Sequence, residues 1–122
     1  MDGKVVAVVV TYNRKELLCE CLDALLSQTF PVSKIVLVNN ASTDGTEDLL
    51  REKGYLDRPQ VDYVLQPKNI GGAGGFYEGI KRCRDKHSYD WVWVMDDDTL
   101  PLADALEKLL EADETLDGNY GW

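Results

Sequence analysis

Apolar runs alternate with helix-like amphipathic stretches from one end of this chain to the other. The run at 5–10 is continuous and almost entirely β-branched, which is typical of a strand covered on both faces. Shorter apolar runs at 35–38, 61–65 and 91–95 predict three more strands. Apolar residues at helical spacing follow each of these runs, so the pattern predicts four consecutive βα units.

Start and stop signals bound the predicted helices. Asn13 and Asp44 each precede a glutamate by three residues, the spacing of a capping box, and Gly54 closes the second helix. Thr99 and Pro101 mark the start of the last helix. The apolar residues at helical spacing are Leu17, Leu18, Cys21, Leu22, Leu25 and Leu26 on one face of the first helix, Phe76, Tyr77, Ile80 and Cys83 expected inward in the third, and Leu102, Ala105, Leu106, Leu109 and Leu110 carried by the last.

Four βα units in succession predict an α/β fold, a Rossmann-like and mostly parallel sheet of about four strands with helices on both faces. The length of 122 residues favours one domain over 1–122. In such sheets, ligands bind beyond the carboxyl ends of the strands, where the strand order reverses. The polar motifs that follow the four predicted strands are Thr11-Tyr12-Asn13-Arg14, Asn39-Asn40, the glycine-rich segment 69–75 and Asp96-Asp97-Asp98. We therefore expect these motifs to converge at one edge of the sheet.

The net charge of −9 is concentrated near one end of the chain. From Asp96 to Asp117 there are nine acidic residues and one basic residue, Lys108, whereas the remaining thirteen acidic and twelve basic residues nearly cancel. This acidic stretch disfavours DNA or RNA as a partner and favours a divalent cation, or a substrate delivered with one. No apolar run approaches the roughly 18 residues of a membrane helix, and no signal segment opens the chain. We expect a cytoplasmic protein, with peripheral membrane association left open.

Several other residues are expected to be structural or solvated. The three cysteines lack metal-site spacing and are interpreted as small buried side chains of a protein in a reducing compartment. His87 lies in a polar connection and is expected at the surface, while Trp91 and Trp93 alternate with valines and are expected in the core. The segment 42–46 is typical of turn and cap chemistry.

The aspartate triplet is the strongest chemical signal. If the strand continued through it, Asp96 and Asp98 would share a face. Two carboxylates about 6 Å apart repel by roughly 3 kcal/mol at an effective dielectric near 20, so a pocket would call for a counter-charge. Carboxylate oxygens suit Mg²⁺ or Mn²⁺, which keep positions open for phosphate. The alternative is a solvated helix N-terminus, where acidic residues are favoured without any metal.

The glycine-rich segment Asn69-Ile70-Gly71-Gly72-Ala73-Gly74-Gly75 opens the third predicted helix. It is not a dinucleotide fingerprint, because no G-x-G-x-x-G can be placed on it. It is not a P-loop either, because no Gly-Lys-Ser/Thr follows. Glycines at a helix start still allow close backbone approach and present free N–H groups to an anion. The competing interpretation is tight helix–sheet packing, although each glycine weakens a helix by roughly 1 kcal/mol relative to alanine.

The remaining candidates are single polar or aromatic residues beside these motifs. Tyr12 would stack on a base ring at the mouth of a site, and Asn39 or Asn40 would hydrogen-bond the edge of the base. Arg14 either meets phosphate or is a solvated residue of the first helical turn. Each of these residues, taken alone, fits a turn or packing role as well.

Taken together and in order, four motifs resemble those of family 2 glycosyltransferases with the GT-A fold. The matching segments are Val9-Val10-Thr11-Tyr12-Asn13-Arg14, Val38-Asn39-Asn40-Ala41-Ser42-Thr43-Asp44-Gly45-Thr46, Asn69-Ile70-Gly71-Gly72-Ala73-Gly74-Gly75-Phe76 and Met95-Asp96-Asp97-Asp98. The likeness spans nearly the whole chain. The residue sequence Gly71-Gly72-Ala73-Gly74-Gly75-Phe76 resembles that of the galactofuranosyltransferase branch and implies UDP-galactofuranose as the donor. Many other family members carry arginine at the position of Phe76.

This resemblance implies roles for individual residues. Asp96 and Asp98 would hold Mg²⁺ or Mn²⁺ against the diphosphate of a nucleotide sugar, and a UDP-sugar is the favoured donor. Asp97 would reach the ribose or the sugar. Tyr12 would line the base pocket and Asn40 would meet the base edge, where the family often has aspartate. The nucleotide-sugar-binding set is then Thr11, Tyr12, Asn13, Arg14, Asn39, Asn40, Asn69, Gly71, Gly72, Gly74, Gly75 and Asp97.

The resemblance also implies an acceptor half that this sequence does not supply. Family members are longer, and their catalytic base, an Asp or Glu that deprotonates the acceptor hydroxyl, comes from the carboxyl-terminal half. We therefore expect this chain to be a truncated, N-terminal part of an enzyme and to be inactive alone. The catalytic base of that enzyme would lie beyond Trp122, and its acceptor would be a glycan or a lipid-linked molecule. A homodimer through an edge exposed by truncation is a further possibility.

Two rival functions stay open at this stage. A metal-dependent phosphotransfer enzyme of the haloacid-dehalogenase type also carries aspartates after a parallel strand, but its D-x-D-x-T motif follows an early strand. A non-catalytic module could use the acidic stretch to bind metal, nucleotide or a protein partner. A sugar nucleotidyltransferase is disfavoured, because Thr11-Tyr12-Asn13-Arg14 lacks the glycine-rich basic loop of that class.

Overall fold

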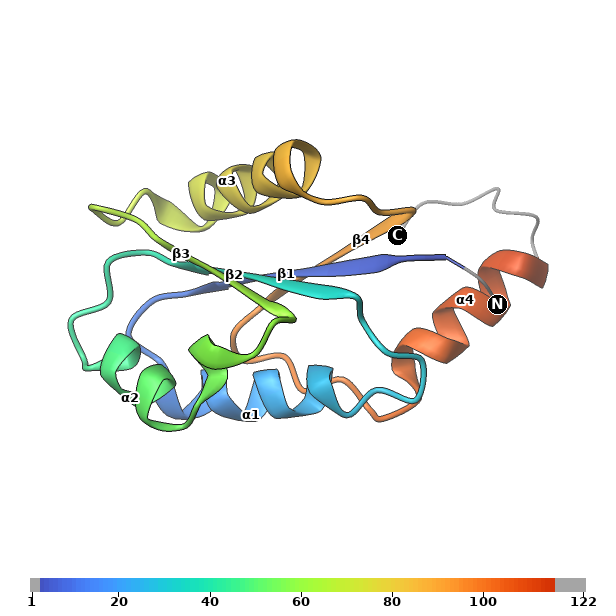
Figure 1. The fold of residues 1–122 in the computed structure, drawn as a ribbon, viewed down its shortest axis with the longest axis horizontal. Helices are drawn as coiled ribbons and strands as arrows, with labels where there is room; N and C mark the ends of the chain where they lie inside the picture. Colours follow the sequence, from blue (N-terminus) through green and yellow to red (C-terminus); the bar gives the residue numbers. More distant parts are fainter. Residues whose placement is uncertain (1–2, 116–122) are drawn as a thin grey trace.

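Strands and helices alternate along the part of the chain that the computed structural model describes, residues 3–115 (Figure 1). The elements in order are β1 (Val5–Thr11), α1 (Lys15–Leu26), β2 (Lys34–Asn39), α2 (Thr46–Glu52), the short 3-10 helix η1 (Tyr55–Asp57), β3 (Val61–Leu65), α3 (Gly71–Lys86), β4 (Trp91–Asp96) and α4 (Ala105–Thr115). All four predicted strands and the four βα units are therefore confirmed.

The four strands form one parallel sheet in the order β3-β2-β1-β4. Val9 in β1 is in register with Leu37 in β2 and Met95 in β4. The chain adds strands on one side of β1 as far as β3, and then crosses to the other side to form β4. The strand order therefore reverses beside β1, which is where a parallel sheet of this kind offers a crevice to a ligand.

Helices cover both faces of the sheet, as predicted. In Figure 1, α3 lies above the sheet and α1, α2 and α4 lie below it. Alternate residues of β1 belong to two separate clusters of buried side chains, with Val5, Ala7 and Val9 on the α1 side. Val6 and Val8 lie on the α3 side. Both faces of β1 exclude water, which explains why its sequence is a continuous apolar run.

Glycines form the face of α3 that touches the sheet. Gly75, Gly79 and Cys83 are buried, whereas Tyr77 and Ile80 are 60% and 44% exposed. The prediction that Tyr77 and Ile80 point inward is thus wrong. A Cβ atom on Gly79 would lie only 2.4 Å from Cγ1 of Val8, so the helix axis lies too close to β1 for larger side chains.

The helix starts differ from the expected capping boxes. α1 has Arg14 at its cap position with no side-chain cap bond, and Asn13 adopts a positive φ of 52°. Asp44 lies one residue outside the cap of α2, where its carboxylate accepts the backbone N–H of Thr46. The last helix begins at Ala105, so Leu102, expected within that helix, precedes it and is 76% exposed.

Other side chains expected in or out of the core are partly misplaced. Leu17, expected on the apolar face of α1, is exposed, while the three cysteines are buried and free as predicted. Trp91 and Trp93 are half-buried, because β4 is an edge strand. His87 is not a surface residue: its side chain is 15% exposed and Nε2 lies 2.7 Å from the carboxylate of Asp62. Within residues 3–115, no helix combines the length and hydropathy needed to span a bilayer.

Candidate functional site

A cleft of about 340 Å³ lies at the carboxyl ends of the strands, where the strand order reverses. It is lined by the ends of β1, β2 and β4 and by the start of α3. The lining residues are Val10, Thr11, Tyr12, Arg14, Asn40, Asn69, Gly71, Gly72, Asp96, Asp97 and Asp98. Four motifs that are far apart in the sequence thus meet at one place, as their positions after the strands led us to expect.

The aspartate triplet forms a turn at one side of this cleft. β4 ends at Asp96, and the N–H of Thr99 then donates to the Asp96 carbonyl oxygen over 3.1 Å. The extended geometry that would place Asp96 and Asp98 on one face therefore stops at Asp96. Asp96 and Asp98 are exposed, whereas Asp97 is buried and accepts a hydrogen bond of 2.8 Å from Oγ1 of Thr11.

Arg14 supplies the counter-charge that a pocket of carboxylates requires. Its Nη1 lies 3.4 Å from Oδ1 of Asp97 and 3.2 Å from Oδ2 of Asp98. Burial raises the pKa of the Asp97 carboxyl above its ordinary value, while the Thr11 hydroxyl and the Arg14 charge partly oppose that rise. The guanidinium therefore helps to keep this carboxylate ionised in a poorly hydrated position.

Asn40 lines the cleft and carries a buried hydrogen-bond acceptor that has no partner. The residue is 2% exposed, and its Nδ2 donates to the Gly71 carbonyl oxygen over 3.0 Å. Its Oδ1 is buried and has no hydrogen-bond partner. A buried acceptor left unpaired costs about 1–3 kcal/mol, so a ligand N–H that reached it would remove that cost.

The start of α3 forms the opposite wall, and its glycines divide into two groups. Gly71 has a positive φ of 79°, and its N–H donates to Oδ1 of Asn69 over 2.8 Å. A Cβ on Gly71 or Gly72 would meet nothing within 4 Å, so these two glycines leave open space in the cleft. The N–H groups of the first helical turn other than that of Gly71 favour an anion there.

Gly74 and Gly75 do not line the cleft. A Cβ on Gly75 would lie 2.6 Å from Cγ1 of Val10, and one on Gly74 would lie 3.0 Å from Ile70. The packing interpretation therefore explains these two glycines, whereas Gly71 and Gly72 belong to the site.

Asn13 and Asn39 lie behind the cleft and hold one of its loops. Oδ1 of Asn13 accepts the N–H of Thr43 over 2.7 Å, and the Asn13 N–H donates to Oγ of Ser42 over 3.0 Å. Asn39 accepts the Ser42 N–H and donates to the Tyr63 hydroxyl, both over 3.0 Å. These bonds join the loop after β1 to the loop after β2. No pattern in the sequence pointed to Tyr63, because its partner Asn39 is known only once β3 is paired with β2.

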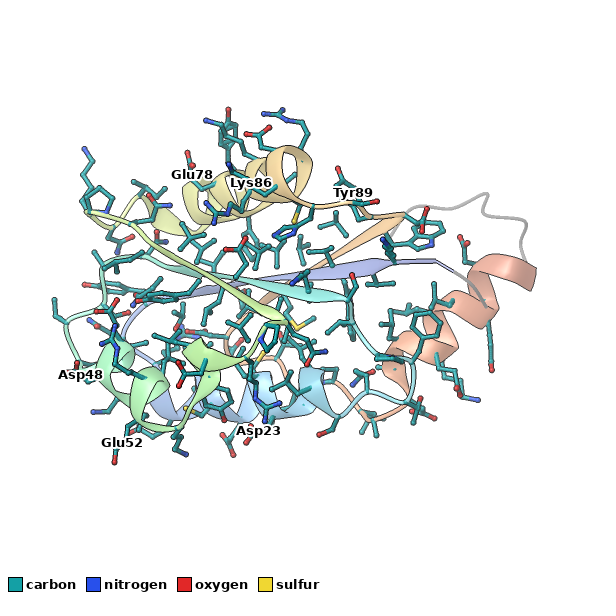
Figure 2. The ribbon with its side chains drawn as sticks, in the orientation of Figure 1. Asp23, Asp48, Glu52, Glu78, Lys86 and Tyr89 are labelled. Carbon is teal, nitrogen blue, oxygen red and sulfur yellow. The ribbon has the colours of Figure 1, made fainter. Side chains whose placement is uncertain are left out.

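The cleft offers a cation few protein ligands. Among residues 3–115, no cluster of three or more His, Cys, Asp or Glu side chains is arranged to hold a metal ion. Other acidic side chains, such as Asp23, Asp48 and Glu52, project from α1 and α2 away from the sheet (Figure 2). The hard oxygens of Asp96 and Asp98 suit Mg²⁺ or Mn²⁺, and an ion held by them would keep coordination positions for oxygens of a ligand.

Comparisons with known proteins agree with the fold and the motifs. Residues 6–120 match the profile of the family described as Glycosyl transferase family 2. The galactofuranosyltransferase GlfT1 of Mycolicibacterium smegmatis is 36% identical over 97 residues, which is 80% of this chain and 30% of the relative. The GlfT1 protein of Mycobacterium tuberculosis H37Rv is 36% identical over 99 residues, 80% of this chain and 31% of the relative.

Solved structures of glycosyltransferases share the fold of this chain. The mannosyltransferase PcManGT from Pyrobaculum calidifontis, in complex with GDP-Man and Mn²⁺, superposes with a TM-score of 0.77 at 27% identity, over 91% of this chain and 32% of its own. S. aureus TarS, residues 1–349, shares the fold with a TM-score of 0.75 at 23% identity, over 92% of this chain and 32% of its own.

The fold, the cleft and the sequence profile together define a family 2 glycosyltransferase domain with the GT-A fold. This chain belongs to glycosyl transferase family 2, and its likeness to GlfT1 agrees with the galactofuranosyltransferase-like branch. The chain spans 30% and 31% of the lengths of the two GlfT1 relatives.

Proposed function

We propose that this chain is the donor-binding part of a galactofuranosyltransferase-like enzyme. It binds a UDP-sugar together with Mg²⁺ or Mn²⁺, and UDP-galactofuranose is the donor we favour. The longer enzyme transfers the sugar to a glycan or to a lipid-linked acceptor. The observation that carries this proposal is the convergence of an unpaired buried acceptor on Asn40, two open glycines and three aspartates in one cleft.

Base recognition rests on Asn40 and Tyr12. Oδ1 of Asn40 would accept the N3–H of uracil, which supplies the partner that this buried oxygen lacks. The Tyr12 ring lines the cleft and is 44% exposed, so it is free to stack on the base. Guanine also carries a ring N–H, and the mannosyltransferase neighbour is described with GDP-Man, so the base has to be tested directly.

Diphosphate recognition rests on the start of α3. The first-turn N–H groups beyond Gly71 and the positive end of the helix dipole favour phosphate oxygens. Because no side chain projects at Gly71 and Gly72, a phosphate can approach the backbone closely at this point. Arg14 lines the same cleft and offers a second positive charge to the diphosphate.

Asp96 and Asp98 would hold the divalent cation. Both are exposed, both line the cleft and both offer the hard oxygens that Mg²⁺ and Mn²⁺ prefer. The ion would neutralise the negative charge of the diphosphate as it leaves the sugar. Asp97 is held by the Thr11 hydroxyl and fixes the turn that carries its two neighbours. Its second oxygen, Oδ1, faces Arg14 and would accept a hydroxyl of the ribose or the sugar.

Sugar transfer itself would need groups that we place in the longer enzyme, beyond Trp122. The support is the length of the relatives, of which this chain spans about a third. In an inverting enzyme, the missing group would be an Asp or Glu that deprotonates the acceptor hydroxyl. We therefore expect no turnover of UDP-galactofuranose by the 122-residue chain with any acceptor. Measurable transfer by this chain would contradict the division into two halves.

Calorimetric titration of the chain with UDP and with GDP, each with and without Mn²⁺, tests the proposal. We expect UDP to bind more tightly than GDP, and Mn²⁺ to strengthen UDP binding. Binding of neither nucleotide nor metal would favour the protein-interaction module instead. Hydrolysis of a phosphate ester by the chain, with no preference for a nucleotide, would favour the phosphotransfer enzyme.

A pair of variants at Asn40 tests the base contact. Asn40→Asp keeps an acceptor oxygen and should retain UDP binding within a few fold. Asn40→Leu has a similar size but removes the acceptor, and the loss of one buried hydrogen bond of about 1.4 kcal/mol predicts roughly tenfold weaker UDP binding. Equal UDP affinity in the two variants would show that Oδ1 does not meet the base. Thermal unfolding of both variants reports whether the lost bond to Gly71 affects the fold.

A further inference from the structure

The Arg14 guanidinium contacts two of the three aspartates that line the cleft. Its Nη1 lies within 3.4 Å of Asp97 and 3.2 Å of Asp98, and both distances are those of an ion pair. The Arg14 and Asp98 side chains are about half exposed, at 51% and 52%, so this pair can open without disturbing the core. The bond therefore competes with any other cation that approaches Asp98.

The helix does not explain an arginine at this position. Arg14 is the cap residue of α1, yet its side chain makes no cap hydrogen bond. A positive charge at a helix N-terminus is unfavourable, because that end of the helix dipole is itself positive. The side chain instead contacts the carboxylates of Asp97 and Asp98, 83 and 84 residues further along the chain.

We propose that Arg14 competes with the divalent cation for Asp98 and releases that carboxylate when a diphosphate enters, so that metal and nucleotide bind as a coupled pair. This inference rests on the function proposed above and adds a role for Arg14 that differs from simple phosphate contact. Guanidinium groups pair with phosphate through two parallel N–H bonds, so a diphosphate offers Arg14 a better partner than the single-atom contacts that it makes with the two aspartates.

Electrostatics sets the size of the effect. A unit positive charge about 5 Å from a divalent ion, in water-like surroundings, weakens binding of that ion roughly tenfold. Without nucleotide, Mn²⁺ has to overcome this repulsion and displace Arg14 from Asp98. With a diphosphate bound, the negative charge of the ligand offsets the guanidinium and Asp98 becomes free. By linkage, the nucleotide and the metal then strengthen each other's binding by the same factor.

A purely structural Arg14 predicts the opposite sign for the metal. If its ion pairs only shaped the turn, removing them would distort the turn and weaken both Mn²⁺ and UDP. If Arg14 competes with the metal, its removal should tighten Mn²⁺ and weaken UDP. Opposite changes for two ligands at one site therefore separate the two roles.

The test measures Mn²⁺ binding to the whole chain from the paramagnetic resonance signal of the free ion, and UDP binding by calorimetry. In Arg14→Gln, we expect Mn²⁺ alone to bind roughly tenfold more tightly. UDP alone should bind several-fold more weakly, and the factor by which UDP strengthens Mn²⁺ binding should fall about tenfold. The matched control is Arg84→Gln, which removes the same charge from the exposed outer side of α3 and should change none of these values.

Unchanged or weaker Mn²⁺ binding in Arg14→Gln would overturn the inference while leaving the proposed function intact, provided that the wild-type chain binds UDP and Mn²⁺. Binding of neither ligand by the wild-type chain would instead overturn the proposed function, and the inference with it.

Discussion

A methyl group placed at two different glycines of α3 should separate the packing role of this segment from its binding role. Gly79 lies against the central strand β1, whereas Gly72 lines the cleft and has open space where a Cβ would be. Both residues lie in α3, but Gly72 is in its first turn, so alanine brings a smaller gain in helix propensity there than at Gly79. The two variants differ in the surroundings of the new methyl group, which are a buried strand at Gly79 and open space at Gly72.

The structure gives the size of the effect at Gly79. The added Cβ would lie 2.4 Å from Cγ1 of Val8, while ordinary carbon–carbon contacts are about 3.5–4.0 Å. Val8 is fully buried in a strand with neighbours on both sides, so it cannot move aside easily. Overpacking costs about 1–3 kcal/mol, and a contact this short belongs in the upper part of that range, about 2–3 kcal/mol, while the helix gains about 1 kcal/mol from alanine. We expect Gly79→Ala to lose about 1–2 kcal/mol of unfolding free energy, which corresponds to roughly 4–8 °C in Tm.

Chemical and thermal unfolding of both variants measure this difference. Gly72→Ala should be as stable as wild type or up to about 1 kcal/mol more stable, but it should bind UDP more weakly because its methyl group enters the cleft. The double variant Gly79→Ala/Val8→Ala should lose less stability than the sum of its two single variants, since removing Cγ1 of Val8 makes room for the new methyl. A Gly79→Ala variant as stable as wild type, or strict additivity in the double variant, would refute this account of the contact.

Two further predictions concern carboxylates. Asp98→Ala should abolish the Mn²⁺-dependent part of UDP binding with little change in thermal stability, because the side chain is half exposed, and an unfolded variant would show that the triplet is structural. At Asp62, burial raises the pKa, but hydrogen bonds from Arg82 and His87 outweigh burial and hold the pKa below its ordinary value. This carboxylate thus stabilises the fold above its unfolded pKa of about 4 and loses that effect as pH falls through the lowered value. Asp62→Asn should cost about 1–2 kcal/mol in urea unfolding at pH 7, with a smaller gap to wild type below about pH 4; the same gap at both pH values would contradict the assignment.

The sequence pattern was sufficient to predict where the site lies. A continuous, β-branched apolar run at 5–10 favours a strand covered on both faces, and polar motifs at the ends of successive parallel strands meet at one edge of the sheet. The cleft between β1, β2, β4 and α3 is that edge. The topology alone therefore predicted that the aspartates, Asn40 and Gly72 lie close together, without any side-chain geometry.

What the pattern missed depends on close contacts that hydropathy does not encode. Helical periodicity turns Tyr77 and Ile80 inward because they are apolar, but the approach of α3 to Val8 leaves room only for glycine. Asn13 was expected to cap α1, whereas its positive φ turns its side chain to Thr43 in another loop. That bond spans 30 residues and follows from the tertiary fold rather than from local sequence.

Two hydrogen bonds divide the walls of the cleft between different pairs of elements. The bond from Thr11 to Asp97 ties β1 to β4, and the bond from Asn40 to Gly71 ties β2 to α3. A protein engineer who randomises the second wall therefore leaves the anchoring of the first intact. Libraries of variants at the β2–α3 junction would test whether the proposed base preference can be changed while the contact between Thr11 and Asp97 is kept.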